Sequence, residues 1–369
     1  MPVSSRLTLT LAAAVTAVEL LCVTAYTQTG TERTARTPNA DIVDPAKSPL
    51  PNPNPTMVKG FGPLPDGRMW GSTAGVDIGP DGNIWAYDRC GTNTCLESNL
   101  APIFKFDRVS GKVLANFGGG MIVFPHGLYV DRDGNVWVTD GQANKEGTKG
   151  HQVIKFTPTG RVLMTLGKAG VAGKGPDTFN EPNDVVIASN GDIFVSDGHN
   201  QADNDPPDSN ARIVKFTKDG KFIKEWGKLG AGAGEFRNPH ALAFDSRGRL
   251  FVADRGNHRI QIFDQDGKFL DQWKQFGRVS GLFIDRNDTL YAIDSESNPM
   301  RHPDWKTGVR IGNTREDKVL AFVPGHENGK YEGAAGEGVA VDNDGNIYGA
   351  EGPISRPVAG GGLTKYVKR

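Results

Sequence analysis

The chain of 369 residues contains a repeated pattern in which apolar and polar positions alternate on both sides of a tight turn. In the stretch HGLYVDRDGNVWVTD (126–140), alternating residues flank Asp133–Gly134–Asn135, which is typical of a β-hairpin. Five related stretches have turn positions spaced 40 to 57 residues apart. The six turn positions are Gly82, Gly134, Gly191, Gly248, Asp288 and Gly345. The pattern therefore predicts six copies of one antiparallel unit.

Most copies continue with two further alternating segments, as in IVKFTKDGKFIKEWG (213–227). Six units of four short strands predict an all-β fold, a six-bladed β-propeller of four-stranded antiparallel blades. The last copy ends after three strands, at LTKYVKR (363–369). The segment TMVKGFG (56–62) resembles the fourth strand of other copies. We therefore expect this N-terminal strand to complete the sixth blade, close the ring and cover an exposed sheet edge.

The N-terminal 55 residues have a different composition. Residues 1–25 carry a positive charge near their start, at Arg6, and continue as a mostly apolar run that ends in small residues. This pattern is typical of a secretory signal peptide. Glu19 interrupts this run and argues against a membrane span. We predict a signal peptide at 1–25, a flexible proline-rich linker at 26–55 and the propeller at 56–369. The mature protein is then secreted or periplasmic and has no membrane span.

Charge and cysteine content narrow the function classes further. With 42 basic and 43 acidic residues the formal charge is −1, so no net field favours nucleic acid, and we expect a monomer. After removal of the signal peptide only Cys90 and Cys95 remain. In an oxidising compartment this short loop predicts a disulfide, whereas in the cytosol both thiols stay reduced. A metal site built on these two cysteines is disfavoured, because no second cysteine pair is present to complete it.

An acid follows the turn position of every copy by six residues. Because it is shared by all six copies, we interpret it as scaffold that caps backbone amides after the second strand. The six acids are Asp88, Asp140, Asp197, Asp254, Asp294 and Glu351.

The position eight residues before each turn differs between copies, so it is a candidate for function. The six residues are Ala74, His126, Asn183, His240, Ser280 and Glu337. Because inner strands line the channel of a propeller, His126, His240 and Glu337 converge on its axis from alternate blades. Two imidazoles and a carboxylate with an open fourth position form a catalytic zinc set, and iron or copper remain open. The alternative is an ordinary polar channel mouth.

The residues after the shared acids return to the same mouth. Arg89 and Arg255 follow two of these acids directly, and His199 lies one residue beyond Gly198. Guanidinium groups bind carboxylate or phosphate through paired hydrogen bonds, so a carboxylate-bearing small molecule or peptide is the expected substrate. Alternatively, each arginine pairs with acids of its own blade.

Several of these stretches resemble a known family. FPHGLYVDRDGNVWVTD (124–140), HQVIKF (151–156), DIFVSDG (192–198), NPHALAF (238–244) and LFVADRGNHRIQIF (250–263) resemble NHL-repeat propellers and, within them, peptidyl-α-hydroxyglycine α-amidating lyases. The resemblance covers most of 56–369. It implies a zinc held by three histidines at the propeller mouth, with arginine and tyrosine side chains nearby. It also implies cleavage of a carbinolamide C–N bond to a peptide amide and glyoxylate.

The family pattern maps incompletely onto this chain. His126 and His240 match two family ligands, and Arg89 and Arg255 match arginine positions. Glu337 stands where the third histidine is expected, and His199 stands where the tyrosine is expected. The family also has an acid associated with a structural calcium, and Gly338 occupies that position, so calcium is implied by resemblance only.

These observations combine into a hypothesis for the site. His126, His240 and Glu337 hold the metal, Arg89 and Arg255 hold a substrate carboxylate, and His199 transfers a proton. Three alternatives remain open. They are a hydrolase that uses a bound water, a non-enzymatic propeller that binds a peptide, glycan or partner protein at its mouth, and a metal with a purely structural role.

Overall fold

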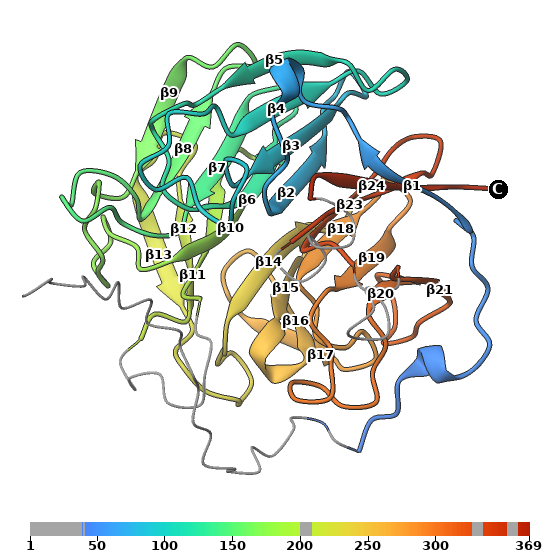
Figure 1. Cartoon of the computed structure of the whole chain (residues 1–369). Helices are drawn as coiled ribbons and strands as arrows, with labels where there is room; N and C mark the ends of the chain where they lie inside the picture. The colour runs from blue at the N-terminus through green and yellow to red at the C-terminus, as the bar shows by residue number, and fades with distance from the viewer. Residues whose placement is uncertain (1–38, 40, 200–208, 327–334, 353–360) are drawn as a thin grey trace, which may run out of the picture. The chain divides into compact units, whose positions relative to one another are not determined.

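Six β-sheets make up the part of the protein that the structure describes. In the computed structural model the described residues are 39, 41–199, 209–326, 335–352 and 361–369. The signal-peptide prediction for 1–25 lies outside them. Residues 36–369 belong to one compact unit, whose described part forms six four-stranded antiparallel sheets (Figure 1).

Each sheet is one blade of consecutive strands, except the last. Blade 1 contains β2 (Thr73–Ile78), β3 (Ile84–Asp88), β4 (Ile103–Phe106) and β5 (Val113–Phe117). Blade 2 contains β6 (Pro125–Val130), β7 (Val136–Asp140), β8 (Gln152–Phe156) and β9 (Val162–Leu166). Blade 3 contains β10 (Pro182–Ile187), β11 (Ile193–Asp197), β12 (Arg212–Phe216) and β13 (Phe222–Trp226).

The second half of the chain repeats this arrangement. Blade 4 contains β14 (Pro239–Phe244), β15 (Leu250–Asp254), β16 (Arg259–Phe263) and β17 (Phe269–Trp273). Blade 5 contains β18 (Gly281–Ile284), β19 (Thr289–Asp294), β20 (Gly308–Asn313) and β21 (Ala321–Pro324). Blade 6 contains β22 (Gly338–Val341), β23 (Ile347–Ala350), β24 (Leu363–Val367) and β1 (Thr56–Phe61). Short 3₁₀ turns lie at η1 (Pro45–Lys47), η2 (Pro65–Gly67) and η3 (Arg255–Asn257).

The inner strands form a closed ring. Each inner strand contacts the next one in the order β2, β6, β10, β14, β18 and β22, and β22 contacts β2 again. This order confirms the predicted six-bladed propeller. The ring is closed within blade 6, where β1 pairs antiparallel with β24 from Thr56–Val367 to Phe61–Leu363. The blue strand β1 and the red strand β24 accordingly lie side by side in Figure 1. The predicted completion of the last blade by the N-terminal strand is therefore confirmed.

Burial follows the position of a strand within its blade. The second strands β3, β7, β11 and β15 are buried at every residue. The outer strands β5, β9, β13 and β17 expose most or alternate residues. Apolar second strands fill the space between neighbouring blades, because both faces of each sheet are covered. The exposed residues of the outer strands mark the solvent-facing edge of the ring.

We call the position eight residues before each turn the ring position. Glycine directly after this position permits close approach of the inner strands. A Cβ atom on Gly127 would lie 2.5 Å from the Asn183 carbonyl oxygen, and one on Gly338 would lie 2.5 Å from that of Ala74. Both distances are shorter than side chains tolerate. The glycines of the His126–Gly127 and Glu337–Gly338 pairs therefore reflect the packing of neighbouring blades at the channel wall.

The shared acids bond mainly to the loop before their own blade. The carboxylates of Asp140, Asp197 and Asp254 accept hydrogen bonds, each at 2.7 Å, from the backbone N–H groups of Phe124, Asn180 and Arg237. We expected caps on amides after the second strand, and two acids also provide them. Asp88 accepts a hydrogen bond from the N–H group of Gly91 at 3.1 Å, and Asp294 accepts one from that of Ser297 at 2.9 Å. The preceding loop dominates because the end of the second strand lies beside the start of the antiparallel first strand.

Part of the predicted linker packs on the propeller. Asp44 is buried and pairs with Arg310 of β20 at 2.9 Å. The Asn54 side chain donates hydrogen bonds of 2.9 Å to the carbonyl oxygens of Gly345 and Tyr366. Residues 41–55 are thus fixed to blades 5 and 6, in contrast to the flexible linker that we expected. The polar composition that indicated a linker instead supplies hydrogen bonds to the scaffold.

Cys90 and Cys95 form the predicted disulfide, with a Cα–Cα distance of 5.1 Å. The bond closes the loop that carries Asn93, whose side chain accepts a hydrogen bond from Arg89 at 2.8 Å. From loop length alone, replacing both cysteines by serine is expected to lower the free energy of unfolding by about 2 kcal/mol. Urea denaturation measures this loss. Reduced wild-type protein should match the variant, and equal midpoints for variant and oxidised wild type would contradict the prediction.

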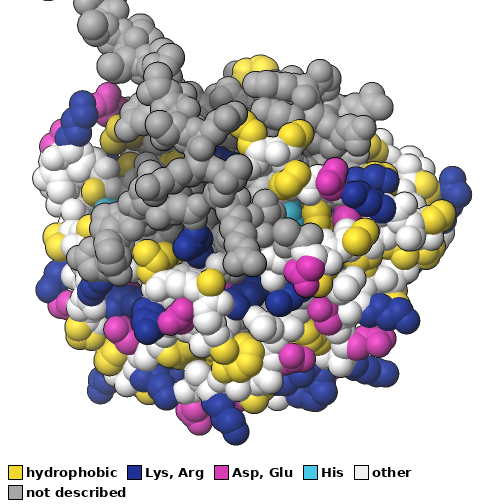
Figure 2. Space-filling model, turned by 90° about the horizontal axis from the view of Figure 1, so that it is seen from below, with side chains coloured by type: hydrophobic (Ala, Val, Ile, Leu, Met, Phe, Trp, Pro, Cys, Tyr) yellow, Lys and Arg dark blue, Asp and Glu magenta, His cyan; other side chains and the backbone are white. Residues whose placement is uncertain are grey.

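Charges of both signs are interspersed over the face shown in Figure 2. This distribution agrees with the near-zero formal charge. The described part of the chain contains no helix with the length and apolar character that a membrane crossing requires.

Candidate functional site

The six ring positions meet at one place, as the repeat alignment predicts. They line a cavity of about 50 Å³ at the end of the channel where the inner strands begin. The residues are Ala74, His126, Asn183, His240, Ser280 and Glu337. The variable position of the repeat therefore marks the wall of a single small site.

Three histidines gather at this mouth. One nitrogen from each of His126, His199 and His240 lies within 4.8 Å of the others. The ring centroids of His126 and His240 are 4.6 Å apart, and those of His126 and His199 are 5.0 Å apart. His126 and His240 lie at the starts of β6 and β14, whereas His199 follows the end of β11. Three imidazole nitrogens at such separations match a metal site with an open coordination position.

Backbone hydrogen bonds orient two of these imidazoles. Nδ1 of His126 lies 2.8 Å from the Asn183 carbonyl oxygen, and Nδ1 of His240 lies 2.6 Å from that of Ser280. Each Nδ1 therefore carries the proton, and each Nε2 is a buried lone pair without a hydrogen-bond partner among the described residues. Fixing one ring nitrogen so that the other can bind is the usual support for metal-ligating histidines. The donor set fits a metal ion on chemical grounds.

The electrostatic surroundings keep the cluster neutral. Burial, with a further contribution from the Arg89 guanidinium, lowers the pKa of His126 to about 3. Burial and then Arg255 hold the pKa of His240 well below its usual value. Neutral imidazole is the form that binds metals.

Glu337 occupies the same cavity but faces arginines. Its two carboxylate oxygens lie 3.5 Å from Nη2 of Arg89 and 3.9 Å from Nη1 of Arg255. The structure thus brings His199, and not Glu337, into the cluster with His126 and His240. The sequence placed a carboxylate among the ligands because only the ring position was compared. His199 comes from a different position of the repeat, in the loop after the second strand.

Both predicted arginines are buried at the mouth, with 2 % and 0 % of Arg89 and Arg255 exposed. Arg89 donates from Nε to the Pro125 carbonyl oxygen at 2.9 Å, and its guanidinium lies over the Phe124 ring at 4.1 Å. Nη2 of Arg255 lies 3.1 Å from Nε2 of His199. To bind a metal through Nε2, His199 must give up this hydrogen bond.

Sequence reasoning missed an arginine cluster next to Arg255. Glu296 lies 3.0 Å from Nη2 of Arg278 and 3.7 Å from Nη1 of Arg255, and it also pairs with Arg301. Burial alone raises the pKa of Glu296, but the three guanidiniums outweigh burial and hold this pKa well below its usual range. The sequence contained one indication that Glu296 lies at the mouth, because this residue follows the shared acid Asp294 by two positions. The cluster leaves an excess of positive charge at the mouth.

The residues at the calcium-associated position of the resemblance do not supply a ligand. Gly338 has no carboxylate, and the close approach of the Ala74 carbonyl oxygen leaves no room for a side chain there. We therefore derive no role for calcium at this position.

Comparisons with known proteins agree with this description. Residues 236–263 match the NHL repeat. A segment of 189 residues is 38% identical to the peptidyl-glycine alpha-amidating monooxygenase of Mus musculus, covering 48% of this chain and 17% of that protein. A segment of 208 residues is 31% identical to a probable peptidyl-alpha-hydroxyglycine alpha-amidating lyase of Caenorhabditis elegans, covering 51% of this chain and 54% of that protein. The matches thus span from about a sixth to about half of these relatives.

Solved structures are similar in fold at low sequence identity. A gluconolactonase from Xanthomonas campestris has a TM-score of 0.54 at 17% identity, over 85% of this chain and 89% of that chain. A virginiamycin B lyase from Staphylococcus aureus has a TM-score of 0.50 at 16% identity, over 80% of this chain and 81% of that chain. These likenesses concern the propeller fold alone.

Proposed function

We propose that this chain is an exported, metal-dependent lyase that cleaves the carbinolamide C–N bond of a peptidyl-α-hydroxyglycine, releasing a peptide amide and glyoxylate. The observation that carries the proposal is the cluster of His126, His199 and His240, with two orphaned Nε2 atoms aimed into a cavity flanked by buried arginines. The similarity to proteins named as α-amidating lyases supports the reaction class. The disulfide supports export to an oxidising compartment.

Our proposed metal ligands are His126, His199 and His240, with zinc as the metal. Bound there, zinc would supply Lewis-acid polarisation of the substrate hydroxyl and lower its pKa. This assignment replaces Glu337 by His199 in the ligand set that the sequence suggested.

Arg89 and Arg255 are the proposed anchors of the substrate carboxylate. Both guanidiniums lie beside the carboxylate of Glu337, which lines the cavity. The nitrogen–oxygen distances of 3.5 and 3.9 Å are longer than those of a close ion pair. An incoming carboxylate can therefore take over these cations.

The chain's residues account for the proton balance of the reaction. Cleavage removes the hydroxyl proton, converts C–OH to the aldehyde C=O of glyoxylate, breaks the C–N bond and returns a proton to the amide nitrogen. Glu337 is the carboxylate that lines the cavity with His126 and His240, so we assign it the acceptance and return of this proton. Under the ligand set suggested by the sequence, His199 has this role instead.

Glyoxylate assay with metal analysis tests the proposal. Purified protein should contain one zinc per chain and release glyoxylate from an α-hydroxyglycine-terminated peptide faster than the spontaneous reaction. Chelation and the variant His126→Ala should abolish the excess, because His126 supplies a ligand nitrogen. A protein without stoichiometric metal and without excess glyoxylate would overturn the proposal in favour of a binding propeller. Bound metal without turnover, with a melting temperature that falls on chelation, would assign a structural metal.

A further inference from the structure

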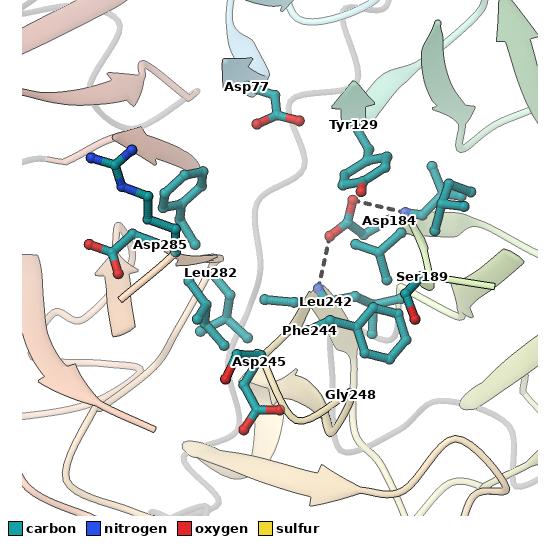
Figure 3. A pocket seen from close by; sticks show the side chains of 18 of the residues that line it. Asp77, Tyr129, Asp184, Ser189, Leu242, Phe244, Asp245, Gly248, Leu282 and Asp285 are labelled. Atoms are coloured by element: carbon teal, nitrogen blue, oxygen red, sulfur yellow. Dashed lines mark hydrogen bonds between the residues drawn. The ribbon is translucent and has the colours of Figure 1, made fainter. Parts of the chain in front are cut away.

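A second and larger cavity opens at the other end of the channel. Its volume is about 520 Å³, within the usual range for small-molecule sites. It is formed where the inner strands end and the glycine turns begin, with walls from all six blades. Figure 3 shows Asp77, Tyr129 and Asp184 pointing into it from one side, and Leu282 and Asp285 lining the opposite side.

An apolar collar separates this cavity from the histidine cluster. Val76, Leu128, Leu282 and Val339 line both the large cavity and the small one that contains His126 and His240, as does Asp184. A ligand that enters between the turns therefore meets these apolar side chains before it can reach the histidines. The large cavity therefore adjoins the one proposed for catalysis, with the collar and Asp184 at the boundary between them.

Two carboxylates lie on its inner wall. Asp77 accepts hydrogen bonds from the N–H groups of Val130 at 2.7 Å and Ile78 at 2.8 Å. Asp184 accepts them from Leu242 at 2.8 Å and Val185 at 2.9 Å, as drawn in Figure 3. Neither carboxylate has a salt-bridge partner within the described part of the chain. Backbone amides hold both groups in place but do not neutralise them.

Burial makes this negative charge costly. It raises the pKa of Asp77 to about 7 and that of Asp184 to about 7, and the charge of Asp77 contributes to the shift of Asp184. A cation placed between the two groups would favour their charged forms.

The remaining charges of the cavity are compensated or lie at the rim. Asp245 pairs with Arg249 at 2.8 Å and with Arg247 at 3.2 Å. Asp285 accepts hydrogen bonds from the N–H groups of its own turn. Arg132 and Arg286 line the cavity at exposed positions, one in blade 2 and one in blade 5. The inner wall is therefore acidic and apolar, whereas positive charge is confined to the entrance.

We propose that this cavity binds an organic ammonium ligand, a primary amine with an apolar body. The ammonium group lies at Asp77 and Asp184, to whose carboxylates it donates charge-assisted hydrogen bonds. Tyr129 and Phe244 present aromatic surface, which attracts a cation as well as an apolar group. The apolar body packs on Leu242 and Leu282. A bare metal ion would leave this apolar wall without a partner.

Three probes of similar size test the chemistry of the site. Phenethylamine, 3-phenylpropanoate and 2-phenylethanol differ mainly in the charge of one group, so calorimetric titration of each into the full chain isolates the contribution of charge. We expect phenethylamine to bind at least about 10-fold more tightly than either of the others. Tighter binding of the carboxylate probe would show an anion site at Arg132 and Arg286, and equal binding of all three would show only apolar burial. Either result overturns the proposal.

Two variants locate the binding. Asp184→Asn should weaken phenethylamine at least about 10-fold and leave 2-phenylethanol unchanged, because the amide keeps the shape but loses the charge. Arg286→Gln is the matched rim control and should not weaken the amine. If Asp184→Asn does not fold, Asp77→Asn serves the same purpose. Calcium alone is a further arm, and calcium binding that excludes the amine would contradict the proposal. His126→Ala should leave amine binding intact, so this test is independent of the proposed lyase activity.

Discussion

Replacing His199 with alanine is expected to lower zinc affinity at least about 10²-fold, more than loss of an outer-shell partner usually costs. The reason is geometric, because a nitrogen of His199 lies within 4.8 Å of the ligand atoms of His126 and His240. Turnover of an α-hydroxyglycine peptide should fall with zinc content. Titration with a competing chelator measures the affinity, and mass spectrometry of the purified variant measures the occupancy.

Glu337→Gln is the matched control for His199→Ala. Under our proposal Glu337 pairs with Arg89 and Arg255 and moves the proton, so the variant keeps its zinc but loses turnover. If His126, His240 and Glu337 hold the zinc instead, as the sequence suggested, the results expected for the two variants are exchanged. Glu337→Gln then loses zinc, and His199→Ala keeps it. A metal content that falls in Glu337→Gln but not in His199→Ala would therefore contradict our ligand assignment.

The sequence was sufficient for the fold because the repeat supplies its own alignment. Six turn positions define six hairpins, and the short last copy requires a fourth strand that only the segment near residue 56 supplies. The same alignment identified the ring position, since residues at equivalent points of equivalent blades must lie around one axis. These inferences depend on periodicity, which is a local property of the chain.

The site was predicted only in part, because its remaining contacts join positions that are not equivalent in the repeat. His199 reaches His126 from the loop after a second strand. Arg278 and Glu296 form their salt bridge between the two ends of one blade's inner hairpin. Whether Glu337 faces a metal or two guanidiniums depends on side-chain placement within a few ångströms. No pattern of residue types fixes such a choice.

The contact between residues 41–55 and the propeller also could not be predicted from the sequence. A proline-rich polar segment has the composition of a linker whether or not it finds partners. The partner of Asp44 is Arg310, 266 positions later in the chain. Arg310 is fully buried, and it also lies 3.6 Å from Asp294, the shared acid of blade 5.

Replacing Arg310 with methionine is expected to lower the free energy of unfolding by about 3–5 kcal/mol, because two buried carboxylates lose their cation. Nη2 of Arg310 donates to Asp44 at 2.9 Å and to the Lys306 carbonyl oxygen at 2.8 Å. Arg108→Met is the control, since its pair with Asp344 is exposed and should contribute less than about 1 kcal/mol. Urea denaturation of both variants at neutral pH measures the difference, and equal losses would contradict the prediction.

The same substitution connects the free energy of unfolding to pH and to the channel mouth that holds the histidine cluster. Asp294 accepts hydrogen bonds from the N–H groups of Arg278 at 3.0 Å and Glu296 at 3.2 Å, so it holds the loop that carries the arginine cluster. Burial already raises the pKa of Asp294, and loss of Arg310 raises it further. A carboxyl whose pKa is higher in the folded than in the unfolded state contributes stability below its unfolded pKa and loses it as pH rises. The deficit of Arg310→Met should therefore be larger at pH 7 than at pH 4, and a deficit that does not depend on pH would show that the charge of Asp294 is not its cause.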